Sequence, residues 1–138
     1  MQYTYNHKVQ YYETDQMGIV HHSNYIRWFE EARTEALENI GFGYAKMEEI
    51  GVVSPVLSVE CEYKTMTRFG ETVIITMEVK KYNGIRMEIE YIVRDRETNE
   101  IRCIGKTSHC FLNKLGKIVS LKKDYLDIHN KMKLMISD

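Results

Sequence analysis

The segment from Tyr11 to Ile40 reads YYETDQMGIVHHSNYIRWFEEARTEALENI and contains the longest helical pattern of the chain. It begins in an extended pattern, reaches a single carboxylate at Asp15 and turns at Gly18, a residue free to adopt a positive φ. The histidine pair His21-His22 follows, and the helical pattern begins directly after it. A carboxylate, a histidine and a helix N-terminus are the components of a small active site. We therefore expect the other elements to be arranged around this segment.

Residues 24–40 have the spacing of an amphipathic helix. Ser23 or Asn24 is expected to cap its first turn, because a short side-chain oxygen can accept hydrogen bonds from the free N–H groups there. Gly41 is expected at the C′ position, and a shorter helix is predicted at residues 44–50, ending at Gly51. The apolar stripe of the long helix consists of Tyr25, Trp28, Phe29, Ala32, Ala36, Leu37 and Ile40.

The rest of the chain is predicted to consist mainly of strands. An alternation of apolar and polar residues with a period of two indicates strands over residues 3–13, 57–64, 73–79, 85–93 and 101–112. The dipeptide Asn83-Gly84 between two of these runs is a strong hairpin signal. Residues 121–136 are predicted to form a C-terminal helix.

These elements predict an α+β fold in a single domain that spans residues 1–138. The architecture we expect is a five-stranded antiparallel sheet wrapped around a long central helix. Such a sheet leaves the edges of its outer strands unpaired, and pairing between subunits is the simplest way to cover them. We therefore expect a homodimer.

The composition excludes several classes of protein. The 138 residues carry a net charge of −1, whereas nucleic-acid-binding domains normally present a strongly basic surface. No run of apolar residues is long enough to cross a membrane or to act as a signal peptide. The cysteines Cys61, Cys103 and Cys110 form no CxxC pair and are expected to be reduced thiols. The sequence therefore predicts a cytoplasmic protein that binds neither membranes nor nucleic acid.

Asp15 is the first candidate for a catalytic residue. An aspartate in a loop most often serves a turn or a helix cap, but three neighbouring features favour a chemical role here. Gly18 lets the backbone come close to a ligand, and the helix N-terminus offers free N–H groups with partial positive charge. His22 supplies a second group that titrates near physiological pH. Together these groups could polarise a carbonyl group and deliver a nucleophile to it.

A metal site is a further possibility for the same segment, built from Glu13, Asp15, His21 and His22. The chain contains no HExxH motif and no Cys/His cluster, so no metal is predicted. Adjacent histidines point in different directions, and at most one of the pair is expected in the site. The motifs of serine hydrolases, P-loop NTPases and dinucleotide-binding domains are absent, and no cofactor is expected.

The opening segment resembles the signature of the hotdog-fold acyl-CoA thioesterases of the hydroxybenzoyl-CoA thioesterase type. That pattern has a tyrosine, an aspartate four residues later, a Gly-Ile/Val-Val step, His-x-Asn-Tyr and a helix ending in Glu-Ala-Arg. It is matched by Tyr11, Asp15, Gly18-Ile19-Val20, His22-Ser23-Asn24-Tyr25 and Glu31-Ala32-Arg33. The likeness continues more diffusely through Arg68-Phe69-Gly70 to about Leu112.

The resemblance implies a homodimer or homotetramer that hydrolyses acyl-CoA to a free acid and CoA. Asp15 would attack the thioester carbonyl or activate a water molecule, and the backbone N–H at His22 would hold the thioester oxygen. The His22 ring and the Tyr11 hydroxyl would orient the reacting groups. The substrate would be contacted by Gly18, Val20, Asn24 and Arg68.

Three other functions are open on the sequence alone. The chain could hydrolyse thioesters on acyl-carrier protein, bind acyl-CoA without catalysis, or act as a hotdog dehydratase or hydratase. The presence of Asp15 and His22 argues against a non-catalytic sensor, and the motif context differs from that of the dehydratases. If CoA is the carrier, its phosphates would meet exposed cations, for which the candidates are Lys64, Arg68 and Arg86.

Overall fold

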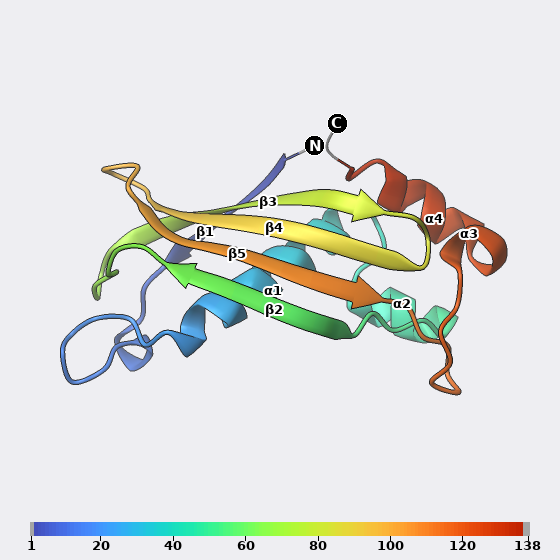
Figure 1. The fold of residues 1–138 in the computed structure, drawn as a ribbon, viewed down its shortest axis with the longest axis horizontal. Coiled ribbons are helices and arrows are strands. Elements are labelled where there is room, and N and C mark those ends of the chain that lie inside the picture. Colours follow the sequence, from blue (N-terminus) through green and yellow to red (C-terminus); the bar gives the residue numbers. More distant parts are fainter. Residues whose placement is uncertain (1, 137–138) are drawn as a thin grey trace.

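The computed structural model describes residues 2–136 and is built on a five-stranded antiparallel sheet with the strand order β1-β3-β4-β5-β2 (Figure 1). The strands are β1 (Gln2–Lys8), β2 (Val56–Tyr63), β3 (Thr72–Tyr82), β4 (Arg86–Asp95) and β5 (Ile101–Cys110). The helices are α1 (Ser23–Asn39), α2 (Tyr44–Ile50), α3 (Leu121–Asp124) and α4 (Leu126–Lys133), and Tyr11–Glu13 forms a short 3-10 helix, η1. The predicted α+β class with five antiparallel strands is confirmed.

The two faces of the sheet follow from the alternation of side chains along its strands. In β3 and β4, successive residues alternate between buried and partly exposed positions, as expected when one face packs on a core and the other faces water. The two strands form the predicted hairpin at Asn83-Gly84, where Gly84 has a φ of +89°. Within residues 2–136, no helix is long and apolar enough to cross a membrane.

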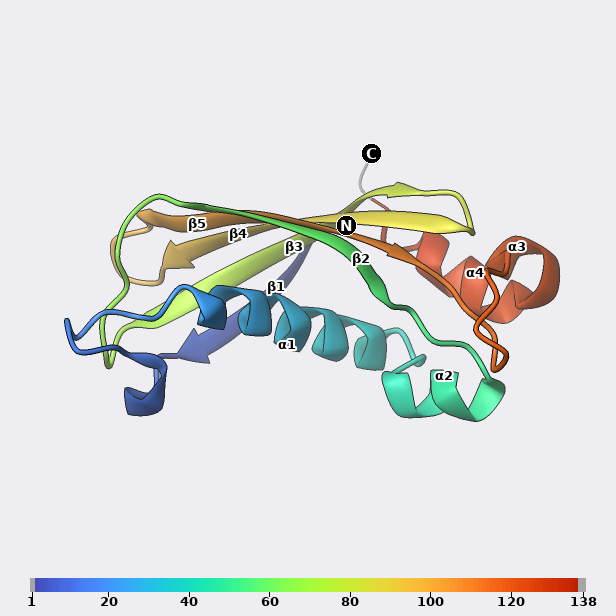
Figure 2. The ribbon, with the colours of Figure 1, turned by 60° about the horizontal axis from the view of Figure 1, so that its bottom comes forward.

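α1 lies along one face of the sheet, and α2 extends the same layer (Figure 2). The predicted apolar stripe faces the sheet, because Tyr25, Trp28, Phe29, Ala32, Ala36 and Leu37 are all buried. The close approach of α1 requires a glycine in β5, since a Cβ atom at Gly105 would lie 2.3 Å from the Phe29 ring. The opposite side of α1 is exposed. In a single chain the sheet therefore covers the helix on one side and does not wrap around it.

The first strand is shorter than predicted. β1 ends at Lys8, because its partner strand β3 begins at Thr72, directly opposite. The chain then leaves the sheet and forms η1, so Tyr11 belongs to a turn and not to a strand. The sequence pattern of alternating residues continues past the point where the neighbouring strand ends.

Two predictions about helices are also wrong. Neither Ser23 nor Asn24 caps α1, because His22 occupies the N-cap position and its side chain accepts no capping hydrogen bond. The first N–H of the helix, that of Ser23, donates instead to Nδ1 of His21 at 3.2 Å. The C-terminal helix is interrupted at Tyr125, whose φ of −139° is not helical, and it is divided into α3 and α4. The second helix, by contrast, has the predicted bounds, Tyr44–Ile50.

A chain of hydrogen bonds connects α1 with the sheet inside the core. Arg33 donates from Nη1 to the Tyr91 hydroxyl at 3.1 Å, and this hydroxyl lies 2.6 Å from Oγ1 of Thr107. Thr107 Oγ1 lies 2.8 Å from Nε2 of His109, whose ring also forms a hydrogen bond with the backbone carbonyl of Pro55. The His109 proton is on Nδ1, which donates to that carbonyl, and Nε2 is therefore an acceptor. The Tyr91 hydroxyl can then donate to Thr107, and the Thr107 hydroxyl to Nε2.

His109 is therefore held as a neutral imidazole in the core. Burial lowers its pKa from 6.5 to about 4, and the positive charge of Arg33 adds to the effect. The side chain is almost completely enclosed, with 1% of its residue surface exposed. Between these two pKa values the unfolded chain binds a proton that the folded protein does not, so acid favours unfolding.

We predict that the free energy of unfolding falls as the pH is lowered from about 7 to about 4.5, with His109 alone contributing roughly 2 to 3 kcal/mol to the loss. His109→Gln retains a side chain that forms hydrogen bonds but cannot take up a proton. In urea unfolding experiments, the variant should lose roughly 2 to 3 kcal/mol less of its free energy of unfolding between the two pH values than the unchanged protein does. An equal loss in the variant and in the unchanged protein would contradict this assignment.

Candidate active site

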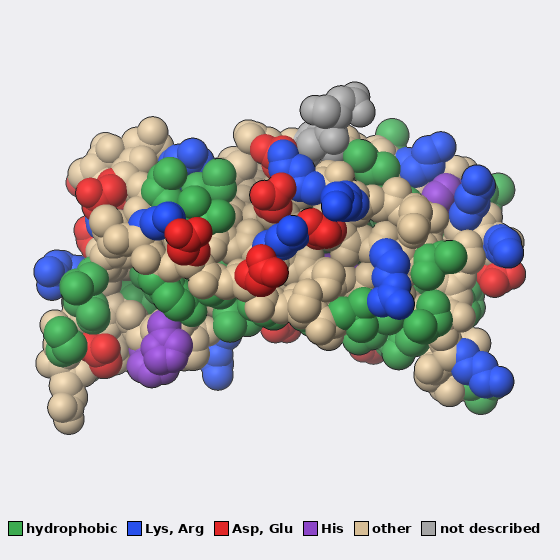
Figure 3. Space-filling view, in the orientation of Figure 1, with side chains coloured by type: hydrophobic (Ala, Val, Ile, Leu, Met, Phe, Trp, Pro, Cys, Tyr) green, Lys and Arg blue, Asp and Glu red, His purple; other side chains and the backbone are tan. Residues whose placement is uncertain are grey.

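A groove of about 770 Å³ lies at the end of the molecule where α1 begins. It is lined by the loop that precedes α1, by the end of β2 and the segment that follows it, and by the start of β5. The loop contributes Asp15, Val20 and His22, and the segment at the end of β2 contributes Tyr63 and Lys64. Histidine side chains are visible on the surface near the start of α1 in Figure 3.

Asp15 opens a tight turn that ends at Gly18. The Gly18 N–H donates to the backbone oxygen of Asp15 at 3.0 Å, and the Met17 N–H donates to the Asp15 carboxylate oxygen Oδ1 at 2.8 Å. Gly18 has a φ of +74°, which explains the need for glycine at this position. The second carboxylate oxygen, Oδ2, has no hydrogen-bond partner within residues 2–136. The turn therefore fixes the carboxylate through one oxygen and leaves the other available for chemistry.

The backbone N–H of His22 is available in a similar way. It stands at the N-cap position of α1 and has no hydrogen-bond partner within the part of the chain that the structure describes. Free N–H groups at a helix N-terminus carry partial positive charge, so this group could donate to a carbonyl oxygen on which negative charge develops.

The His22 ring lies between two other rings. It stacks on His21 with 4.1 Å between centroids, and it meets Tyr63 at 6.1 Å in an edge-on arrangement. Burial and the neighbouring Cys61 thiol raise the pKa of Tyr63 to about 12, so its hydroxyl stays protonated and can donate a hydrogen bond. The Tyr63 hydroxyl donates to the backbone oxygen of His22 at 3.4 Å, so the imidazole ring of His22 and a neutral donor lie together in the groove.

The loop that carries Asp15 is tied to the rest of the protein by Glu13, a buried carboxylate. Its Oε1 lies 2.8 Å from Nε2 of His7 and accepts a hydrogen bond from the Gln10 N–H at 2.7 Å. Its Oε2 accepts from Nε1 of Trp28 at 2.7 Å. Its backbone oxygen accepts from the His21 N–H at 2.9 Å. One residue therefore links β1, η1, α1 and the loop between them.

The charge of Glu13 is stabilised where it stands. Burial alone would raise the pKa of this carboxyl, but hydrogen bonds from the Gln10 N–H, the His7 ring and the Trp28 indole outweigh burial and lower the pKa. A carboxylate that accepts several hydrogen bonds keeps its charge at neutral pH and holds its donors in place. Glu13 was considered in the sequence only as a metal ligand, and its structural role depends on His7 and Trp28, which are distant in the sequence.

The groove collects four of the seven residues expected in the site, namely Asp15, Val20, His22 and Arg68. Tyr11 lies outside it, is 78% exposed and rests its ring against the edge of Phe69. Gly18 shapes the turn next to Asp15 without lining the groove. Asn24 donates from Nδ2 to the carbonyl oxygens of Glu13 and His21, so it supports the loop.

Comparison with known proteins shows the family to which this fold and segment belong. Residues 9–128 match the thioesterase-like superfamily. The chain belongs to this superfamily. It is 38% identical over 128 residues to a protein of Aquifex aeolicus that is provisionally named an esterase, and the match covers 93% of this chain and 98% of the relative. The resemblance noted in the sequence is thereby confirmed.

Two further similarities agree with this membership. The chain is 36% identical over 123 residues to a Bacillus subtilis protein provisionally named the acyl-CoA thioesterase YneP, with 88% of each chain covered. The solved structure of a DHNA-CoA thioesterase from Staphylococcus aureus matches with a TM-score of 0.89 at 30% identity and covers 96% of this chain and 89% of that one. The hotdog fold is confirmed, and the protein is a hydrolase of the thioesterase type.

The superfamily motif does not account for a second charged cluster in the groove, centred on Arg102. This buried side chain forms ion pairs with Glu71 at 3.1 Å, with Glu100 at 2.6 Å and with Asp95 at 3.5 Å. Glu71, Glu100 and Arg102 all line the groove. The sequence analysis missed this cluster. The signal that could have revealed it is an arginine at a buried position of the fifth strand.

The histidine pair of this thioesterase-like chain is not placed to form a metal centre. Within residues 2–136, no three His, Cys, Asp or Glu side chains are arranged to hold an ion together. The His21 ring lies with Nδ1 2.8 Å from Oγ of Ser23. His21 therefore contributes to the loop conformation before α1, while His22 lines the groove.

We predict that Glu13→Gln lowers the free energy of unfolding by roughly 2 to 4 kcal/mol. The two carboxylate oxygens of Glu13 accept hydrogen bonds from His7, Gln10 and Trp28, and the NH₂ group of glutamine would face one of these donors without an acceptor. Glu31→Gln is the matched control, since Glu31 also approaches the His7 ring, at 3.4 Å, but its side chain is 44% exposed. The control should lose less than about 1 kcal/mol. Urea denaturation measures both, and equal losses would show that the buried position of Glu13 has no special importance.

Proposed function

We propose that this chain hydrolyses acyl-CoA thioesters in the groove beside α1, with Asp15 as the reactive carboxylate. The observation that carries the proposal is that a fixed Asp15 and the helix N-terminus at His22 border one groove. Its curated relatives include a protein provisionally named an acyl-CoA thioesterase, which supports this choice of substrate. The reaction yields a free acid and CoA.

Two routes are consistent with this arrangement. In the first, Asp15 attacks the thioester carbonyl carbon, CoA leaves as its thiolate and the resulting mixed anhydride is hydrolysed by water. In the second, Asp15 takes a proton from a water molecule, which attacks the same carbon while the thiolate leaves and is protonated. In both routes the His22 N–H stabilises the negative charge on the carbonyl oxygen. The His22 ring and the Tyr63 hydroxyl help to orient the thioester.

Cations in the same groove are suited to the phosphates of CoA. Lys64 and Arg68, both proposed from the sequence, line the groove together with Asp15. Arg86 instead lies at the other end of the sheet, at the start of β4. Because β4 runs for ten residues between these two ends, Arg86 is about 30 Å from the groove in a single chain. Lys64 and Arg68 are therefore the better candidates for phosphate contacts within one subunit.

We further propose that the functional unit is a homodimer, or a tetramer of such dimers, formed along the edge strand β2. This strand is last in the sheet and pairs only with β5 on its inner edge. Several of its large apolar side chains are exposed, including Val56, Leu57, Val59 and Tyr63. Antiparallel pairing of β2 with its copy would cover these side chains and the unpaired backbone groups. It would also bring the start of one β2 close to the groove at the end of the other.

The proposed setting is the cytoplasm. Cys61, Cys103 and Cys110 are all free thiols, which suits a reducing compartment. Cys61 and Cys103 lie side by side, and burial together with their mutual interaction raises the pKa of Cys103 to about 12. The thiols of Cys61 and Cys103 are therefore protonated and poorly nucleophilic, so the proposed chemistry stays with Asp15.

We predict that Asp15→Asn lowers kcat for acyl-CoA hydrolysis by roughly 10²–10⁴, the range expected when a positioned acid–base group is lost. KM should change little, because the carboxylate acts mainly in the transition state. Thiol release from a panel of acyl-CoA substrates measures both constants. Asp127→Asn, at an exposed position in α4, is the control and should retain full activity. Normal turnover in Asp15→Asn would exclude this aspartate, and no release from any substrate would overturn the proposed activity.

We predict that Val59→Lys halves the molecular mass measured by sedimentation equilibrium, because charges facing each other across the paired edges oppose association. Val59 is partly exposed in the single chain, so the fold should survive. Ile118→Lys introduces the same charge at an exposed position outside β2 and should leave the mass unchanged. A dimeric Val59→Lys protein would indicate that the subunits associate through another surface.

A further inference from the structure

Arg33 is a buried cation that lacks a counter-ion. Its residue surface is 7% exposed, and it forms no ion pair with a carboxylate within residues 2–136. The neutral phenol groups of Tyr91 and Tyr44 interact with the guanidinium. Its Nε–H has no hydrogen-bond partner. Such an arrangement is unfavourable in a protein interior, where buried charges are normally paired and buried donors normally satisfied.

A small cavity lies next to this guanidinium. It measures about 10 Å³ and is enclosed between α1, α2 and α4 on one side and the sheet on the other. Arg33, Tyr44, Ser54 and His109 supply its polar walls. The Ser54 hydroxyl is also buried without a hydrogen-bond partner. Within residues 2–136, three buried side-chain polar atoms have no hydrogen-bond partner. Two of them, Arg33 Nε and Ser54 Oγ, belong to residues that line this one cavity.

The surroundings of the cavity make it electrostatically positive. No Asp or Glu lines it, and its remaining walls are apolar, with several methionines. His109 is neutral and adds no charge of its own near neutral pH. Arg33 therefore acts on the cavity as an isolated positive charge in surroundings of low polarity, where electrostatic interactions are strong.

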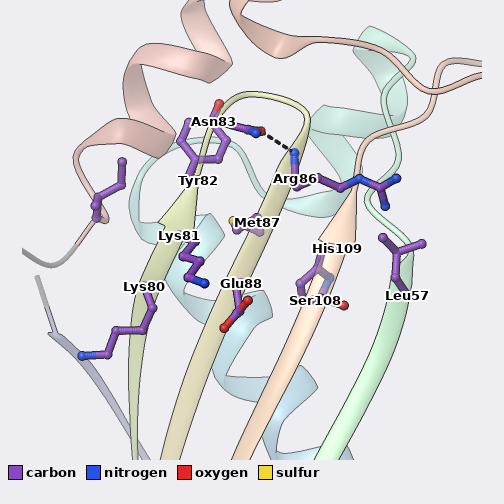
Figure 4. A pocket seen from close by; sticks show the side chains of 11 residues that line it. Leu57, Lys80, Lys81, Tyr82, Asn83, Arg86, Met87, Glu88, Ser108 and His109 are labelled. Carbon is purple, nitrogen blue, oxygen red and sulfur yellow. Dashed lines mark hydrogen bonds between the residues drawn. The ribbon is translucent and has the colours of Figure 1, made fainter.

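The outer surface at this end of the sheet adds to the positive potential. Figure 4 shows a second hollow, of about 620 Å³, that shares Met87 and His109 with the inner cavity and carries Lys80, Lys81 and Arg86. Lys80 is paired with Glu78 at 2.8 Å, and Glu88 also lines the hollow and interacts electrostatically with Lys81. Lys81 and Arg86 form no ion pair within residues 2–136, and Lys and Arg side chains gather over this end of the molecule in Figure 3. Summed over such a region, single charges produce a field that attracts anions.

We propose that the inner cavity binds one small monovalent anion of the halide class, held by the Arg33 Nε–H and the Ser54 hydroxyl. The cavity has room for a single monatomic ion, but it is too small for the larger phosphate, sulfate and carboxylate ligands. A water molecule would satisfy the hydrogen bonds but leave the buried charge of Arg33 uncompensated. A chloride ion would accept the same hydrogen bonds and would also neutralise the charge of Arg33. It would fasten α1 to the segment before β2 that contains Ser54, independently of the reaction in the groove.

Crystals grown with bromide in place of chloride provide the direct test. We expect an anomalous difference peak within contact distance of Arg33 Nε and Ser54 Oγ, and no peak in this cavity for crystals of Arg33→Met. A water molecule in the cavity, with no anomalous signal, would overturn the proposal. Bromide found only in the outer hollow near Lys81 and Arg86 would overturn it as well.

Thermal unfolding in solution tests the same site without a crystal. At constant ionic strength, replacing gluconate by chloride or bromide should raise Tm in proportion to the logarithm of the halide concentration once the site is filled. Ser54→Ala keeps the charge and the fold, and should raise the halide concentration needed for this effect about tenfold, the consequence of losing one hydrogen bond to a charged group. Lys81→Gln combined with Arg86→Gln is the surface control.

The surface control should respond to halide as the unchanged protein does. An equal Tm in gluconate and chloride, or a response that disappears with the surface variant and persists in Ser54→Ala, would show that the inner cavity holds no ion. Arg33→Met should abolish the response if it folds, and the Ser54→Ala comparison decides the question if it does not.

Discussion

The hydrogen bonds to the buried carboxylate of Glu13 hold together the segments on which the groove depends. They join β1 through His7, η1 through the Gln10 N–H and α1 through Trp28. The backbone oxygen of the same residue fixes His21, one position before the N-cap of α1. Asp15 lies two residues after Glu13 in the chain. Glu13 thereby determines how the loop that carries Asp15 approaches the helix N-terminus.

This arrangement divides the work between a rigid support and an exposed loop. The apolar side of α1 is fixed against the sheet by buried side chains such as Trp28 and Phe29, which leaves the helix little freedom to move. Asp15 itself is exposed and is positioned by a turn of four residues. Functional groups are often placed on loops in this way, because a loop can bring polar groups to a ligand while the scaffold keeps them in position.

The sequence predicted the features that depend on local periodicity and on single turn residues. The apolar stripe of α1, the bounds of α2 and the hairpin at Asn83-Gly84 all follow from such patterns. The features it did not predict depend on partners that are far apart in the chain. β1 ends where β3 begins, and the importance of Glu13 and Arg102 becomes visible only when distant donors and carboxylates are brought together. The proximity of Asp15 and His22 follows from their short separation in the sequence, whereas the position of Tyr11 outside the groove was not expected.

The chain of hydrogen bonds from Arg33 to His109 also has a direction. Its protons all point from the guanidinium towards the imidazole, which gives the core a permanent dipole across the layer between α1 and the sheet. A proton added at Nε2 of His109 would turn the final acceptor into a donor, and the hydroxyls of Thr107 and Tyr91 would have to reverse. That reversal ends at Arg33, which has no lone pair to receive a proton. Acid therefore does more than charge one histidine: it breaks the polar connection between α1 and the middle strands of the sheet. The polar contacts that remain between these layers lie at the edge strand β1, between Tyr3 and Asn39 and between Tyr5 and Glu31.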